Sequence, residues 1–116
     1  MTESLKDEDR IRHMLEAALK AAEFSRGHKR SDLEKDEKLA LSLIHLLEIL
    51  GEAAGKVSAG FRQNHPQIPW NQVSGIRNRL IHGYFDIDLD IVWQTVTARL
   101  PGLIRELKKT LKANQP

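Results

Sequence analysis

Apolar residues near the start of the chain recur at steps of three and four positions, which is the spacing of one face of an α-helix. This first stripe consists of Ile11, Met14, Leu15, Ala18 and Ala22. It predicts a helix that begins at a cap supplied by Asp7 or Asp9 and ends near Arg26, before Gly27. Charged residues at i,i+4 spacing follow the opposite side, so we expect that side to face solvent.

A second and broader stripe predicts a long helix over residues 31–58. Ser31 and Glu34 have the spacing of a capping box at its start. The stripe consists of Leu39, Leu43, Leu46, Leu50, Ala53 and Val57, and Ala40, Ile44 and Leu47 widen it. Such a face suits either a helix with neighbours on two sides or a helix with one side in a dimer interface. Gly51 and Gly55 each cost about 1 kcal/mol relative to Ala, and we expect the close approach of another backbone to offset that cost.

A connection over residues 60–69 contains two prolines, which exclude a continuous helix. Pro69 can occupy a first helical position, because its missing N–H is not needed there. We therefore expect a third helix over residues 70–82. Its buried line would consist of Val73, Ile76 and Leu80, with a polar line of Ser74, Asn78 and His82 beside it.

Residues 86–91 alternate between aspartate and apolar residues, which is the signature of a strand. We reject a strand, because no other segment could pair with it and a lone strand is unstable. Asp88 or Asp90 instead caps a fourth helix, in which Pro101 must produce a kink or a restart. Its inward residues are Val92, Val96, Leu100, Leu103, Leu107 and Leu111. The pattern predicts a single all-α domain over residues 1–116, a bundle of four long helices that allows a short fifth.

Composition narrows the class of protein without deciding its function. The chain has 116 residues, no cysteine and a formal net charge of +2, too small to indicate a nucleic-acid-binding protein. It has no apolar run near the roughly 20 residues that cross a bilayer. The N-terminal segment is acidic where a signal peptide has a basic region. We therefore expect a cytoplasmic protein without membrane contact.

The residues best suited to chemistry are concentrated at the end of the predicted third helix. No other stretch concentrates so many groups able to hold a phosphate and to move protons as an acid or a base. Histidine suits proton transfer near neutral pH, so His82 is the candidate for that role. Arg77 offers a fixed fork of donors that matches a phosphate. Asn78 could orient the His82 imidazole or donate to the phosphate.

Helix geometry adds a constraint to this pair. Residues five positions apart on a regular helix point roughly 140° away from each other. Either the helix loosens at His82 and Gly83, or two chains complete the site across a two-fold axis. The second arrangement would also supply two histidines, one for each proton transfer.

Other polar residues are weaker candidates. Glu48 and Glu52 could support Arg77 or Arg79, and Glu52 could instead pair with Lys56 on an exposed face. Arg79 could contact substrate phosphate or face solvent. No group of histidines and carboxylates has the spacing of a metal site, so we expect neither a metal nor another cofactor.

The motif also carries a resemblance. Arg77, His82 and Tyr84 match the Arg-x4-His-x-Tyr signature of the HEPN superfamily, and the chain resembles in particular the HepT toxins of bacteria and archaea. The resemblance extends to residues 47–54, 68–70, 91–93 and 100–101, and so spans nearly the whole chain.

This resemblance implies an α-helical bundle that forms a homodimer, with two motifs facing each other in a cleft. It implies a metal-independent endoribonuclease that acts on RNA as the toxin of a type VII-like toxin–antitoxin system. The implied partner is a minimal nucleotidyltransferase antitoxin of the MntA type, which attaches AMP to the motif tyrosine, here Tyr84.

Two alternatives remain. The chain could be a non-catalytic HEPN bundle that presents substrate to a nucleotidyltransferase subunit or dimerises with it. It could also be a signalling or dimerisation bundle, which would need only the apolar stripes. Arg77, Asn78 and His82 together favour the ribonuclease, because a scaffold has no use for that combination.

Overall fold

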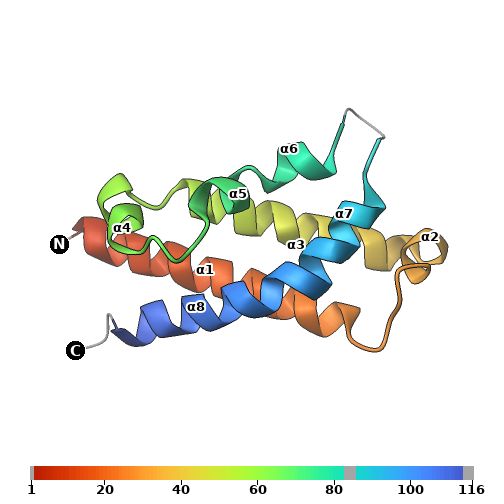
Figure 1. The fold of residues 1–116 in the computed structure, drawn as a ribbon, viewed down its shortest axis with the longest axis horizontal. Coiled ribbons are helices and arrows are strands. Elements are labelled where there is room, and N and C mark those ends of the chain that lie inside the picture. Colours follow the sequence, from red (N-terminus) through yellow and green to blue (C-terminus); the bar gives the residue numbers. More distant parts are fainter. Residues whose placement is uncertain (1, 83–85, 114–116) are drawn as a thin grey trace.

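The computed structural model describes residues 2–82 and 86–113 and confirms the all-α class, with two long antiparallel helices at its centre (Figure 1). These are α1 (Thr2–Ser25) and α3 (Glu37–Gly55). A C-terminal helical run crosses them: α7 (Leu89–Gln94), η1 (Thr95–Arg99) and α8 (Leu100–Ala113), of which α8 packs on α1. Short helices complete the bundle: α2 (Asp32–Lys35), α4 (Ala59–Asn64), α5 (Trp70–Ser74) and α6 (Ile76–Leu80). No helix among the described residues is long and apolar enough to cross a membrane.

The broad apolar stripe of α3 is buried within a single chain. Leu43, Leu47 and Leu50 are at most 1% exposed, and the other residues of the stripe are also buried. The helix packs against α1 on one side and against α5 and α6 on another. Neighbours on two sides therefore account for this stripe without a dimer interface.

The start of α3 differs from the prediction. Asp36 has extended backbone angles (φ −117°, ψ 92°), and its side chain accepts a hydrogen bond from the Leu39 N–H at 3.1 Å. Ser31 has helical backbone angles and forms no side-chain capping hydrogen bond. The capping box at Ser31 is therefore wrong, because an N-cap residue must lie outside the helix, and residues 32–35 form only the separate turn α2.

Asp7 does not cap the first helix either, since α1 begins at Thr2. Its carboxylate is buried and accepts hydrogen bonds from the Ser58 N–H at 2.9 Å and the Ser58 hydroxyl at 2.6 Å. Ser58 in turn caps α4, where its hydroxyl accepts from the Phe61 N–H. Asp7, expected from the sequence to cap a helix, thus joins α1 to the beginning of α4 through Ser58.

Gly51 brings the α5–α6 segment close to α3. A Cβ at this position would lie 2.9 Å from the Ile76 side chain and 3.0 Å from the Val73 carbonyl oxygen. At Gly55 the nearest such atom is the Ser74 Cβ, at 4.0 Å. The expected close approach of another backbone is confirmed, and Gly51 is where it is tightest.

The predicted third helix is broken and shorter than expected. Gly75 separates α5 from α6, and α6 ends at Leu80. Ile81 is extended (φ −118°, ψ 116°) and forms an isolated antiparallel bridge with Ile87. The rejection of a strand over residues 86–91 is confirmed among the described residues, because the bridge is isolated. The reason for it, that no other segment could pair there, is wrong at Ile87.

The C-terminal run continues through Pro101. The Leu100 N–H bonds the Thr95 carbonyl five residues earlier, which is the wide turn of a π-helix. Proline removes one N–H and crowds the preceding turn, and the wider turn lies directly before it. The expected kink or restart thus takes the form of η1.

Candidate active site

Arg77 is held in place by a carboxylate from the neighbouring long helix. The Arg77 Nε donates a hydrogen bond to Oε2 of Glu48 on α3 at 3.1 Å. The Arg77 side chain remains 67% exposed, so its terminal N–H groups are open to solvent. An exposed ion pair of this kind adds about 0–1 kcal/mol of stability at most. Its chief effect is to fix the direction of the guanidinium group.

Asn78 and Glu52 lie near this pair but do not join it. The Asn78 side chain is exposed, and no hydrogen bond joins it to another described residue. Glu52 is exposed one turn beyond Glu48 and pairs with Lys56 at 3.7 Å. Of the two glutamates proposed to support the motif arginines, only Glu48 contacts one.

His82 lies outside the helix that carries Arg77. Its backbone N–H donates to the Asp86 carbonyl at 2.7 Å, and the Asp88 N–H donates to the Leu80 carbonyl at 2.8 Å. Two further elements fix this segment: the Ile81–Ile87 bridge and the Asp88 side chain, which caps α7. The His82 side chain is exposed, and these contacts hold the backbone that carries it.

The end of α6 at Leu80 changes the geometric argument from the sequence. The angle of 140° assumes one regular helix through both residues, whereas the chain leaves helical geometry before His82. Loosening of the helix, one of the two alternatives, is observed, but it begins at Ile81, one residue before the expected position. The placement of Asn78 and His82 on a common helix face is wrong for the same reason. The two-chain site stays a prediction.

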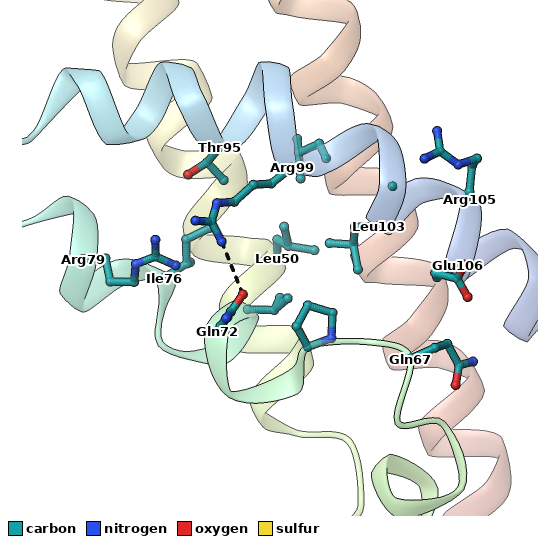
Figure 2. A pocket seen from close by; sticks show the side chains of 14 residues that line it. Leu50, Gln67, Gln72, Ile76, Arg79, Thr95, Arg99, Leu103, Arg105 and Glu106 are labelled. Atoms are coloured by element: carbon teal, nitrogen blue, oxygen red, sulfur yellow. Dashed lines mark hydrogen bonds between the residues drawn. The ribbon is translucent and has the colours of Figure 1, made fainter.

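Arg79 belongs to a pocket on the other side of α6 from Arg77. This pocket has a volume of about 390 Å³ and lies between α3, α5, α6, η1 and α8. Figure 2 shows Arg79 and Arg99 at one end of it, Arg105 and Glu106 at the other, and Leu50 and Leu103 between them. No sequence pattern indicates that Arg99 approaches Arg79, because this proximity depends on how η1 crosses α5 and α6.

Two further expectations concern modification and metals. Tyr84 and Gly83 lie outside the described residues. Across residues 2–82 and 86–113, no group of three or more His, Cys, Asp or Glu side chains is arranged to hold a metal ion.

Comparisons with known proteins agree on one family. The model of the family described as "Ribonuclease HepT-like" matches residues 14–110. A protein of Thermococcus cleftensis named "Probable ribonuclease HepT" is 35% identical over 104 residues, which are 90% of this chain and 94% of that protein. "Putative RNase TTE0752" of Caldanaerobacter subterraneus subsp. tengcongensis is 32% identical over 102 residues, 88% of this chain and 91% of that protein. No solved structure matches the chain significantly.

Proposed function

Because this chain belongs to the HepT-like ribonuclease family, we propose that it is a metal-independent endoribonuclease and the toxin of a type VII-like toxin–antitoxin pair in the cytoplasm. The observation that carries the proposal is the arrangement of Arg77 and His82. Both side chains are exposed, and Glu48 and the Ile81–Ile87 bridge anchor the segments that hold them.

The reaction needs only these groups. The 2′-oxygen of the RNA forms a bond to phosphorus as its proton passes to a base, and the bond from phosphorus to the 5′-oxygen breaks as that oxygen takes a proton from an acid. The products are a 2′,3′-cyclic phosphate and a free 5′-hydroxyl. An imidazole can serve as either the base or the acid. The Arg77 fork holds the negative charge on the phosphoryl oxygens.

One chain supplies one motif histidine, whereas the reaction moves two protons. We therefore propose a homodimer in which the two copies of His82 divide the roles of base and acid. A two-fold axis places the same surface of each chain opposite itself, so the two motifs would share one cleft. The need for two proton-transfer groups is the argument for the dimer. The apolar stripe of α3 does not support it, because that stripe is already buried within the chain.

Control of the toxin is assigned to an MntA-like nucleotidyltransferase that transfers AMP from ATP to the Tyr84 hydroxyl and releases pyrophosphate. The attached phosphate would add negative charge to the motif, which must bind an RNA phosphate through Arg77. Incubation with the partner and ATP should therefore add the mass of one AMP to the wild-type chain and none to Tyr84→Phe. The same addition on both chains would contradict the assignment.

Expression of the chain alone in bacteria tests the toxin. We expect growth arrest with the wild-type chain and normal growth with folded Arg77→Ala or His82→Ala variants. Loss of a proton-transfer group typically costs about 10²–10⁴-fold in rate. Growth arrest by a folded His82→Ala variant would instead indicate a bundle that acts by binding.

A further inference from the structure

The pocket beside α6 has the size and lining of a small-molecule site. Its volume of about 390 Å³ lies within the range of roughly 300–1,000 Å³ that ligand pockets occupy. Leu50, Val73 and Leu103 are buried and contribute an apolar floor. A flat apolar group can therefore lie against this floor while polar groups contact the rim.

The rim carries three arginines and one carboxylate, and so a net positive charge. Glu106, on the same rim, pairs with Lys109 at 3.7 Å. Arg79, Arg99 and Arg105 come from three different elements, and none of them forms an ion pair with a carboxylate among the described residues. Arg77 differs, since it is paired with Glu48. Three guanidinium groups around one hollow repel one another unless an anion lies between them.

The irregular turn of the C-terminal run supplies part of this rim. The π-helix η1 begins at Thr95 and ends at Arg99, and both residues line the pocket. The Arg99 Nη1 donates to Oε1 of Gln72 on α5 at 3.3 Å, which holds the guanidinium group over the opening (Figure 2). Single π-turns inside longer helices are frequently found at functional sites.

We propose that this pocket binds one nucleotide of the RNA substrate next to the cleavage site, an inference that rests on the proposed ribonuclease function. The nucleotide's phosphate lies against Arg79 and Arg99, and its base covers the apolar floor. The Gln67 and Gln72 amides line the same pocket and can hydrogen-bond to a base edge.

The position of Arg79 connects this pocket to the motif. Arg77 and Arg79 are two residues apart on α6, so their side chains point roughly 200° apart around the helix. Arg77 faces the scissile phosphate, and Arg79 faces the neighbouring nucleotide. An RNA strand that crosses α6 therefore contacts both arginines at once.

A second copy of this chain is the other candidate occupant, and the charges disfavour it. A two-fold contact through this pocket would place the arginines of one chain opposite the same arginines of its partner. Like charges at close range oppose such a contact. A polyanion such as RNA faces no such repulsion.

Equilibrium binding of the four 5′-ribonucleoside monophosphates to the purified chain tests the proposal. We expect Arg79→Ala and Arg99→Ala each to weaken binding about tenfold, as the loss of a charge-assisted hydrogen bond does. Lys112→Ala, on α8 and outside the pocket, is the matched control and should bind as the wild type does. Inorganic phosphate and the free nucleosides should bind at least about tenfold more weakly than the nucleotides, because each makes only half of the contacts.

Equal binding of nucleotides by the wild type and both arginine variants, or equal affinity for inorganic phosphate and nucleotides, would overturn the proposal. A changed oligomeric state of Arg99→Ala in sedimentation would overturn it as well, because the pocket would then be a contact between copies. Failure of the proposed ribonuclease function is a separate result, because the wild-type chain would then bind nucleotides in this pocket and cleave no RNA.

Discussion

The ion pair between Arg77 and Glu48 shows how one exposed side chain can be prepared for catalysis. Glu48 accepts the hydrogen bond of the Nε–H of the guanidinium group, so the N–H groups of its two terminal nitrogens remain available to a phosphate. Substrate positioning of this kind is sensitive, because a displacement of 1 Å can cost about 10²-fold in rate. In the proposed mechanism, Glu48 is thus a positioning residue that acts through Arg77.

Glu48→Ala should lower kcat for RNA cleavage about tenfold, because the freed guanidinium group would sample other directions. Its free energy of unfolding should change by at most about 1 kcal/mol, as expected for an exposed ion pair. Glu52→Ala is the matched control, since Glu52 lies on the same helix and pairs with Lys56 alone. Equal kcat values for the two variants, measured beside their denaturation curves, would show that Glu48 does not position Arg77.

Among the helices, Gly51 on α3 determines how closely the segment that carries Arg77 and Arg79 packs against α3. No other residue allows the Ile76 side chain and the Val73 carbonyl to lie so close to α3 at position 51. The position of α6, and with it that of Arg77 and Arg79, therefore depends on the absence of a Cβ at Gly51.

Gly51→Ala should destabilise the fold by about 1–3 kcal/mol through overpacking and should also reduce RNA cleavage, because α6 must move away from α3. Gly55→Ala, one turn further along, should instead stabilise the fold by up to about 1 kcal/mol, since alanine is the better helix former and has room there. Thermal unfolding and cleavage rates measured side by side check both changes. A Gly51→Ala chain as stable and active as the wild type would contradict the tight contact.

The sequence predicted the elements that depend on periodic burial and missed those that depend on contacts between segments. The stripes of α1, α3 and α8 and the close approach at Gly51 were found because they follow from local spacing. The end of α6 at Leu80 was missed, because it depends on pairing between Ile81 and Ile87 across residues that local spacing does not connect. Arg77, Asn78, Arg79 and His82 were chosen from the motif, whereas the end of α6 before His82 and the pocket around Arg79 required the structure.

For the whole molecule, the proposed reaction requires two chains, because each chain supplies one of the two His82 side chains. In a heterodimer of one wild-type and one His82→Ala chain, either the base or the acid would be missing from the shared cleft. Such a heterodimer, isolated with two different affinity tags, should retain far less than half of the wild-type cleavage rate. A rate near one half would mean that each chain carries a complete site. A fully active monomer in sedimentation would exclude the shared cleft altogether.

Cleavage of a defined RNA by the purified chain in excess EDTA tests the catalytic roles of Arg77 and His82 most directly. We expect the wild-type chain and His13→Ala, which removes an exposed histidine of α1, to cleave at the same rate and to leave 2′,3′-cyclic phosphate ends. His82→Ala, with an unchanged circular dichroism spectrum, should be slower by about 10²-fold or more. Cleavage that EDTA abolishes, or a folded His82→Ala chain that cleaves at the wild-type rate, would contradict the assignment of Arg77 and His82 as a metal-independent catalytic pair.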